Sequence, residues 1–375
     1  MDQAKILIIG GGVVGCAIAR ELSRRWDDVY LVEALPKPGM ATSTRNSGVI
    51  HSGLYYPKDS LKARHCLAGN RLTYEFCAAH GVPHRRTGKL IVAANAHEAE
   101  ELAPLQRRGE ANGVAGLRLL DAAGIRAREP HVAGVAALEV PSTGILSAEE
   151  LVKAYARVAA EQGASIVTRA RVTALEPRGA AIRAELRIGD EESSQRETIE
   201  ARCVVNAAGL YSDEVAALLG NRSWKIYPVR GEYCEMRGAQ AGLINALVYP
   251  LPHADMLTLG AHFTKTLWGT VLVGPTARYI ADKNDYEHDR LKPADFAASA
   301  RVLLPEIGES DLHLAYSGIR PKLVPPGEKG PADFVIARDP GVPQAIQLVG
   351  IESPGLTSAP SIAGHVAALV AEVLA

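Results

Sequence analysis

The stretch that decides the fold is KILIIGGGVVGCAIARELSRRWDDVYLVE, residues 5–33. The apolar run 5–9 predicts a short buried strand of a parallel sheet, and the apolar spacing over 13–24 predicts a helix. A second β-rich run follows at 29–33. A strand, a glycine-rich turn, a helix and a second strand in this order predict one βαβ unit.

The glycine turn, together with the acid that ends this unit, predicts a bound dinucleotide. Gly10, Gly12 and Gly15 form the pattern G-x-G-x-x-G. The first glycine permits the tight turn, the second lets backbone approach a pyrophosphate, and the third lets the helix pack closely on the strand. Phosphates would lie at the helix N-terminus, and the Glu33 carboxylate would accept hydrogen bonds from ribose hydroxyls. A coincidental glycine-rich turn is the plainer alternative, and the unit alone does not separate NAD from FAD.

Length and composition narrow the class of protein. The chain has 375 residues, 41 basic and 42 acidic side chains, and a formal net charge of −1. This length predicts two domains or one large domain with an insertion, and the balanced charge gives no reason to expect nucleic acid as a partner. Five cysteines without a CxxC pair indicate reduced thiols rather than a disulfide framework or a zinc site. With no secretory signal and no transmembrane run, we expect a cytoplasmic protein, and peripheral contact with the inner face of the membrane stays open.

The rest of the chain predicts an α/β protein, α+β overall, with two interleaved domains. Further helices are expected at 58–80, 98–112, 148–162 and 361–374. Further strands expected beside the first unit are 165–168, 171–175, 203–206 and 345–349. Strands expected in a second, antiparallel or mixed sheet are 88–94, 135–140, 226–236, 247–249, 256–262 and 270–273. The expected layout is a Rossmann-type nucleotide-binding domain over 1–80, 140–220 and 315–375, and a mostly antiparallel-sheet substrate domain over 81–139 and 221–314.

Five further segments resemble one family of flavoenzymes. The segment TRNSGVIHSGLYY, residues 44–56, resembles the flavin-side loop of the D-amino-acid-oxidase-like family of FAD enzymes. VVNAAG at 204–209 resembles the second FAD motif of that family. The segments that resemble its L-2-hydroxyglutarate-oxidising members are RGEY at 230–233, SGIRPKL at 317–323 and GIESPGLTS at 350–358. The resemblance implies the fold of that family and a bound FAD.

The chemistry of these segments suits contacts with a flavin. Residues 45–48 are short, polar and glycine-containing, so their backbone donors can lie against a flavin edge, although an ordinary loop has the same composition. Small side chains at 207–209 let backbone approach a cofactor. Segment 350–358 precedes the last helix, whose N-terminus stabilises negative charge on a reduced flavin. The predicted cofactor contacts are Gly10, Gly12, Val13, Val14, Gly15, Glu33, Thr42, Ser43, Arg45, Asn46, Ser47, Gly48, Val172 on the adenine side, Ala207, Ala208, Gly209, Gly318, Pro354, Gly355, Leu356 and Thr357.

Basic residues near the end of the chain predict a substrate clamp. Arg320 stands between a strand and Pro321 in a glycine-rich turn, and its planar fork matches a carboxylate. In the family that the chain resembles, an arginine at this type of position holds the substrate carboxylate. Lys322 or Arg230 is expected to reach a second, distal carboxylate, and Tyr233 to line the pocket. Solvated surface charges and simple packing are the alternative roles of these residues.

Two of the eleven histidines are candidate bases. His51 lies three residues after Gly48 in the flavin-side loop, and His262 lies in a strand expected to line the substrate domain. An imidazole with a pKa near neutrality suits removal of a hydroxyl proton while hydride leaves carbon. A structural role is the alternative for each histidine. No set of histidines, cysteines or carboxylates has metal-ligand spacing, so no metal is expected.

The motifs and the resemblance together imply FAD-dependent oxidation of a 2-hydroxy acid, most closely L-2-hydroxyglutarate to 2-oxoglutarate. The flavin carries the redox chemistry, an arginine clamps the carboxylate, and a histidine takes the hydroxyl proton. The electron acceptor would be a quinone or oxygen. One alternative is an amine or amino-acid oxidase of the same fold, of the glycine- or sarcosine-oxidase kind. The other is a flavin-binding electron-relay or structural subunit without its own substrate. Oligomeric state and covalent attachment of FAD stay open.

Overall fold

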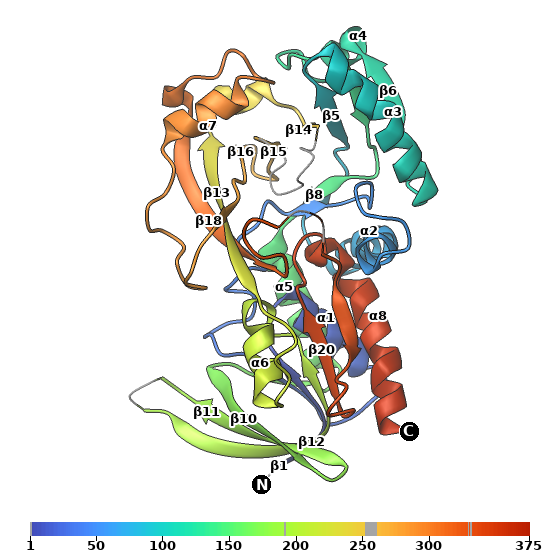
Figure 1. Ribbon diagram of the computed structural model, residues 1–375, viewed down its shortest axis with the longest axis vertical. Helices are drawn as coiled ribbons and strands as arrows, with labels where there is room; N and C mark the ends of the chain where they lie inside the picture. The colour runs from blue at the N-terminus through green and yellow to red at the C-terminus, as the bar shows by residue number, and fades with distance from the viewer. Residues whose placement is uncertain (1, 191–192, 252–260, 329, 331) are drawn as a thin grey trace.

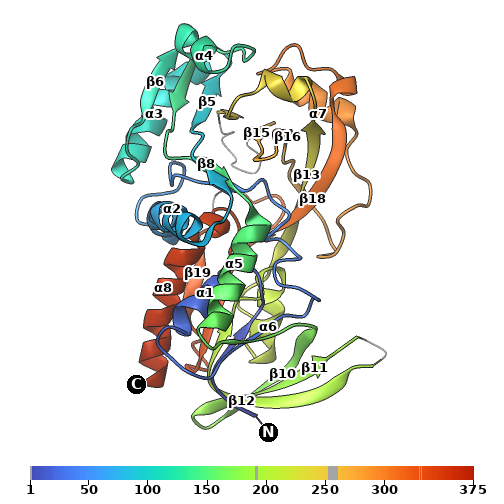
Figure 2. The ribbon, with the colours of Figure 1, turned by 180° about the vertical axis from the view of Figure 1, so that it is seen from behind.

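The computed structural model describes residues 2–190, 193–251, 261–328, 330 and 332–375. Figure 1 shows an elongated molecule, with one sheet and its helices in the lower half and a second sheet in the upper half. Figure 2 shows the same division from behind. Both chain termini lie in the lower half, so the two halves are connected by internal segments of the chain.

The first sheet has eight strands with a parallel centre, and it contains the predicted βαβ unit. Its strands in spatial order are β10 (Ala170–Arg178), β11 (Ala181–Ile188), β12 (Gln195–Asn206), β1 (Asp2–Ile9), β2 (Val29–Val32) and β9 (Ser165–Val167), with β20 (Ala345–Val349) beside β12 and β19 (Val335–Arg338) beside β20. Strand β1 pairs in parallel with β2 and with β12. Ile6 and Ile8 pack into one hydrophobic core and Leu7 and Ile9 into another. Both faces of β1 are therefore buried, which explains its continuous apolar sequence.

Helices cover both faces of this sheet. On one face, α1 (Val13–Leu22) contacts α5 (Ala148–Glu161) and α8 (Gly355–Leu374), and α2 (Leu61–His80) packs on α8. On the other face, α6 (Ser212–Leu218) contacts β10, β12 and β20. The Ser60 and Ser147 side chains accept hydrogen bonds from backbone N–H groups of the first turns of α2 and α5, so each helix begins at a serine cap. The helix predicted at 148–162 is confirmed.

Helix α8 begins at Gly355 rather than at 361, although Pro360 stands within it. Sequence patterns place a helix start after such a proline because proline breaks one hydrogen bond of the ladder. Here Thr357, Ser358 and Ala359 are buried in the protein core, and this packing stabilises the extra turn. Among the described residues, α8 is the one helix long and apolar enough to cross a membrane, with a mean hydropathy of 1.3 over its most apolar 18 residues. Of those 18 residues, 44% are buried inside the protein.

Over the described ranges of the chain, the second sheet has nine strands and is mostly antiparallel, as predicted. Its strands in spatial order are β17 (Arg278–Tyr279), β13 (Tyr227–Met236), β16 (Val271–Val273), β15 (Phe263–Lys265), β14 (Leu247–Pro250), β5 (Lys89–Ala93), β7 (Ala136–Glu139) and β6 (Arg118–Asp121), with β18 (His313–Lys322) also paired to β13. The helices of this half are α3 (Ala96–Ala111), α4 (Ala122–Arg128) and α7 (Pro293–Ala300). A short sheet of β3 (Val49–Ile50), β8 (Gly144–Leu146) and β4 (His84–Arg85) accompanies them. Most of the strand predicted at 256–262 lies outside the described residues.

Strand β18 revises two sequence predictions. It pairs with β13 from Tyr227 to Glu235, so the predicted domain boundary at 315 falls inside a strand of the second sheet. Arg320 and Pro321 lie within this strand and not in a glycine-rich turn. Proline is compatible with the strand because, within the described parts of the chain, β18 pairs with β13 alone and is an edge strand. The carboxyl end of β18 thereby enters the nucleotide-binding half.

Candidate active site

A cavity of about 590 Å³ lies between the two sheets, at the carboxyl end of β1. This edge of an open α/β sheet is where ligand sites form. The wall includes the glycine turn, the 42–51 loop, parts of β13 and β18, and segment 351–356. The predicted residues that line it are Gly12, Val13, Val14, Thr42, Ser43, Arg45, Asn46, Ser47, His51, Ala207, Gly209, Tyr233, His262, Gly318, Arg320, Lys322, Pro354, Gly355 and Leu356.

The glycine turn has the close approaches that its sequence predicts. Gly10 has a φ of +108°, and a Cβ on it would lie 2.5 Å from the Ala207 carbonyl oxygen. A Cβ on Gly15 would overlap the Gly10 carbonyl oxygen, so the helix lies directly on the turn. Gly12 instead borders the cavity. The turn is therefore shaped to leave backbone open to a pyrophosphate at the N-terminus of α1.

Glu33 and Val172 lie outside this cavity wall, on the β2 side of the turn. The Glu33 carboxylate accepts hydrogen bonds of 2.7 Å from the N–H groups of Gly11 and Leu35. Burial raises the pKa of Glu33, and these N–H groups partly offset the rise. Ala170 at the start of β10 donates its N–H to the Glu33 carbonyl oxygen, which brings β10 beside the end of β2. Val172, two residues further, packs with the core of the first sheet, so its predicted adenine contact stays a prediction.

Hydrogen bonds tie the start of the flavin-side loop to both halves of the protein. The Ser43 hydroxyl oxygen accepts the N–H of Val13 at 2.9 Å, which connects the loop to the first turn of α1. The Thr42 hydroxyl donates to the Ile319 carbonyl oxygen at 2.9 Å, which connects it to β18. The loop is thus fixed between the glycine turn and the strand that carries Arg320.

The middle of this loop is held by its own side chains. The Asn46 side-chain oxygen accepts the N–H of Gly48 at 2.9 Å. The Arg45 guanidinium lies over the Tyr286 ring, 4.3 Å from its centroid. A Cβ on Gly318 would overlap the Arg45 carbonyl oxygen, so only glycine allows β18 to approach the loop this closely. The polar segment predicted to face a flavin is therefore an ordered part of the cavity wall.

Arg320 projects from β18 into the cavity wall. Its Nη1 atom donates a long hydrogen bond of 3.4 Å to the Thr276 carbonyl oxygen. Across from it stands Gly231, where a Cβ would lie 3.3 Å from Nη2. The guanidinium therefore has one backbone partner and a small neighbour, a suitable arrangement for binding a carboxylate at its remaining N–H groups.

Lys322 also lines the cavity, together with Lys62 and Glu352, to which the sequence analysis gives no role. Its Nζ lies 3.4 Å from Glu352 Oε2, while Lys62 Nζ donates to Glu352 Oε1 at 2.9 Å. Burial alone would raise the pKa of Glu352, but Lys62 and Lys322 hold it below its usual range. Glu352 is therefore ionised. From the sequence, Lys62 is placed only within the helix expected at 58–80, and Glu352 only within segment 350–358.

His51 is held in the cavity wall by both its backbone and its ring. Its N–H donates to the Thr357 hydroxyl at 2.9 Å, and its carbonyl oxygen accepts from Asn70 Nδ2 at 2.9 Å. Its ring Nε2 lies 3.3 Å from the Ser353 hydroxyl. Burial, with a smaller effect of the Lys89 charge, lowers the pKa of His51 to about 3. This pKa lies below the near-neutral value that the sequence analysis expects, because burial disfavours the charged ring, and it favours an uncharged imidazole at neutral pH.

His262 lines another part of the cavity. Its ring stacks on Tyr249 with centroids 3.6 Å apart, and only 5% of the residue is exposed. On the second sheet, Lys89 Nζ lies 4.8 Å from the Tyr249 ring centroid and donates to the Tyr55 hydroxyl at 3.2 Å. Burial lowers the pKa of Lys89 to about 7. The ring of Tyr233, also in the wall, lies tilted against that of Tyr316, with centroids 5.0 Å apart.

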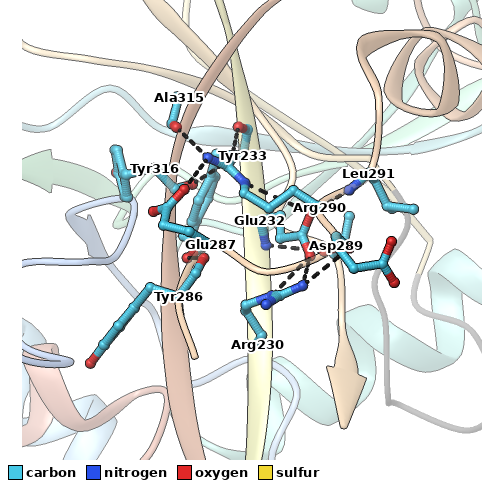
Figure 3. Close-up of polar contacts among 12 residues, drawn as sticks. Arg230, Glu232, Tyr233, Tyr286, Glu287, Asp289, Arg290, Leu291, Ala315 and Tyr316 are labelled. Atoms are coloured by element: carbon cyan, nitrogen blue, oxygen red, sulfur yellow. Dashed lines mark hydrogen bonds and ion pairs between the residues drawn. The ribbon is translucent and has the colours of Figure 1, made fainter. Parts of the chain in front are cut away.

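The structure contradicts the predicted role of Arg230. Its side chain is fully buried among the polar contacts drawn in Figure 3, and it does not line the cavity, because it alternates along β13 with Gly231 and Tyr233, which do. Arg230 Nε donates to Glu232 Oε1 and Nη1 to Asp285 Oδ1, each at 3.0 Å. With its charge paired on that face, Arg230 cannot bind a substrate carboxylate. Of the other predicted cofactor residues, Ala208 packs against the core of the first sheet and the Thr357 hydroxyl accepts the N–H of His51, so their cofactor contacts stay predictions.

Comparison with known proteins assigns the fold and the site to a family. The family model described as FAD dependent oxidoreductase, DAO, matches residues 5–369. The chain belongs to this family. It is an FAD-dependent oxidoreductase, so the predictions of FAD and of an enzyme are confirmed and the alternative of a subunit without its own substrate is dropped.

Two relatives of this DAO-family enzyme are similar in sequence over nearly the whole chain, and two solved structures are similar in fold. The mitochondrial L-2-hydroxyglutarate dehydrogenase of Arabidopsis thaliana is 35% identical over 98% of this chain and 83% of that protein. The L-2-hydroxyglutarate dehydrogenase of Escherichia coli (strain K12) is 31% identical over 98% and 93%. The solved L-alpha-glycerophosphate oxidase from Mycoplasma pneumoniae, with FAD bound, has a TM-score of 0.88 and 28% identity over 99% of this chain and 95% of that one. Glycine oxidase from Geobacillus kaustophilus, with a TM-score of 0.82 and 22% identity, shares the fold.

The residues of this DAO-family enzyme fit FAD. The Gly10–Gly15 turn leaves open backbone for the pyrophosphate, and the ordered 42–48 loop supplies polar groups for the flavin edge. Gly355 and Leu356 begin α8 at the cavity, where the free N–H groups of a helix start favour negative charge on a reduced ring. Arg320 and His51 line this same cavity.

Proposed function

We propose that this DAO-family enzyme oxidises L-2-hydroxyglutarate to 2-oxoglutarate. The observation that carries the proposal is the charge of the cavity wall, where the described lining residues include five cations, Arg45, Lys62, Arg108, Arg320 and Lys322, and one carboxylate, Glu352. Lys62 pairs with Glu352, and Arg320 and Lys322 on β18 then present two cations to the cavity, which suits a dicarboxylate. The naming of relatives at 31% and 35% identity as L-2-hydroxyglutarate dehydrogenases supports the same substrate.

Arg320 would bind the C1 carboxylate through its planar fork. Lys322 lies two residues further along β18, and alternate residues of a strand point to the same face. Their Cα atoms are therefore separated by about 6.6 Å. This separation suits the two carboxylates of a five-carbon diacid, so Lys322 would bind the distal carboxylate.

His51 would act as the base. Its uncharged ring can accept the hydroxyl proton at the nitrogen that carries no hydrogen, and the Ser353 hydroxyl, 3.3 Å from Nε2, helps to hold the ring in the cavity wall. When bound, FAD accepts the hydride equivalent that leaves Cα. Removal of the proton by His51 leaves the carbonyl of the 2-oxo acid. His262 lines the same cavity and is the second candidate for this role.

The test is reduction of the flavin without oxygen. We expect L-2-hydroxyglutarate to bleach the flavin absorbance of the purified holoenzyme, and the D enantiomer, glycine, sarcosine and L-glutamate to leave it unchanged. Bleaching by one of the amines alone would replace the proposal by the amino-acid oxidase alternative. Glycine oxidase shares the fold at 22% identity, so the fold itself is compatible with either chemistry.

For the electron acceptor we propose a quinone or oxygen. After reduction by the substrate, the rates of reoxidation by a soluble quinone and by air-saturated buffer can be compared directly. Release of hydrogen peroxide accompanies only the reaction with oxygen. A reduced enzyme that neither acceptor reoxidises would contradict this part of the proposal.

A further inference from the structure

We infer that Lys62 is a specificity-determining residue, which holds Glu352 so that Lys322 stays available to a second carboxylate of the substrate. The inference rests on the proposed function, because it concerns how the same cavity recognises a dicarboxylate. Lys62 comes from the first turn of α2, Lys322 from β18 and Glu352 from the loop before α8. All three line the cavity.

The two lysines contact Glu352 unequally. Lys62 Nζ donates a hydrogen bond to Oε1 at 2.9 Å, whereas Lys322 Nζ stands 3.4 Å from Oε2. A charge-assisted N–H···O bond is normally 2.7–2.9 Å long. Lys62 is therefore the principal partner of Glu352, and Lys322 makes the weaker contact, which a second carboxylate can replace.

Lys62 is also the more firmly held of the two lysines. Its backbone N–H donates to Asp333 Oδ1 at 2.9 Å, and its ammonium lies 5.4 Å from the centroid of the Phe334 ring. Its side chain is 7% exposed, against 14% for Lys322. Residues 333 and 334 thus keep the ammonium of Lys62 at Glu352.

Charge explains why this arrangement affects specificity. An ionised carboxylate in a cavity wall repels an anionic substrate unless a cation neutralises it. With Lys62 on Glu352, Lys322 on the distal carboxylate and Arg320 on the C1 carboxylate, three cations match three anions. Without Lys62, Glu352 would take Lys322 as its partner, and the distal carboxylate would lose the cation that β18 presents to it.

The decisive variants are Lys62→Met, Glu352→Gln and their combination. Lys62→Met should weaken binding of glutarate to the holoenzyme by about 10- to 100-fold, the size of a charge-assisted hydrogen bond. Adding Glu352→Gln to it should restore the affinity, because Lys322 then has no competing carboxylate. Glu352→Gln alone should bind glutarate at least as tightly as the unchanged protein. Lys62→Arg keeps the ion pair and should retain most of the affinity.

The measurement is calorimetric titration with glutarate and with butyrate, its monocarboxylate counterpart, combined with KM for L-2-hydroxyglutarate and L-2-hydroxybutyrate. Only the dicarboxylates should respond to Lys62→Met. The matched control is Lys153→Met, which removes an exposed lysine paired with Glu149 and Glu150 on α5. Melting temperatures show whether each variant is folded.

Three outcomes would overturn the inference: unchanged glutarate affinity in Lys62→Met, equal loss for monocarboxylates and dicarboxylates, or no recovery when Glu352→Gln is added. Failure of the unchanged enzyme to oxidise L-2-hydroxyglutarate is a different result, because it removes the proposed function. The glutarate titration then still decides the role of Lys62, since it needs binding and not turnover.

Discussion

Replacing Arg320 by lysine separates the charge of the clamp from its geometry. The guanidinium makes a long hydrogen bond of 3.4 Å to the Thr276 carbonyl oxygen, stands beside Gly231 and lines the cavity. Lysine keeps the positive charge but presents it at a single point, and it loses one of the two parallel bonds to a carboxylate. Losing one charge-assisted hydrogen bond costs about 1.5–3 kcal/mol. We therefore expect kcat/KM for L-2-hydroxyglutarate to fall about 10- to 100-fold.

The assay is anaerobic stopped-flow reduction of the flavin, with FAD content measured from the visible spectrum of each preparation. FAD content should stay the same, because Arg320 projects toward the substrate side of the wall and not into the glycine turn. Arg278→Lys is a matched control, since Arg278 forms an ion pair with Asp289 at the protein surface. Kinetics of Arg320→Lys within twofold of the unchanged enzyme would refute the clamp.

Other changes test the remaining parts of the site. Gly12→Val should abolish FAD binding, because its side chain would fill the room left for the pyrophosphate; a yellow, active Gly12→Val protein would contradict this. His51→Asn should slow flavin reduction about 10²–10⁴-fold. Because the pKa of His51 is lowered to about 3, protonation removes the base only near that pH, and the rate should be flat from about pH 5 to 8; a rise through a neutral ionisation would assign the base elsewhere. Arg230→Met should lower the free energy of unfolding by about 3–5 kcal/mol, because Glu232 and Asp285 lose their partner, and leave KM of the folded protein unchanged; a raised KM would return Arg230 to the substrate site. For Lys89, whose pKa falls to about 7 on folding, the unfolded chain binds more protons between about pH 7 and 10.5, so its contribution to stability should rise with pH across that window and be absent in Lys89→Met.

The nucleotide-binding half could be predicted because its signals are local. Strand β1 is buried on both faces, so its apolar run is continuous, and Gly10 and Gly15 fall where backbone approaches backbone. The cap at Ser147 likewise fixes the start of α5 within a few residues. Each of these features depends on neighbours in the chain, which the sequence shows directly.

The partners within the site could not be predicted, because they are distant in the chain. Lys62 and Glu352 come from α2 and from the loop before α8, and each has the sequence context of an ordinary surface residue. The pKa of His51 depends on burial by the surrounding walls, which no local pattern reveals. Arg230 was misplaced for a related reason, because the face of β13 that meets the cavity depends on its partner strands.

Strand β13 borders the cavity with one face and contacts residues 285–291 with the other. Gly231 and Tyr233 face the cavity, whereas Arg230 and Glu232 hold the chain at 285–291 by ion pairs and hydrogen bonds (Figure 3).

Tyr286 lies in that held segment. Its ring lies under the Arg45 guanidinium, and its carbonyl oxygen accepts a hydrogen bond from the Ser317 hydroxyl of β18. The buried Arg230 network is therefore connected through Tyr286 to the flavin-side loop. Residues 230–233 thus contribute to the site by holding a wall of the cavity. Arg230 itself stabilises the fold from the face of β13 that is turned away from the cavity.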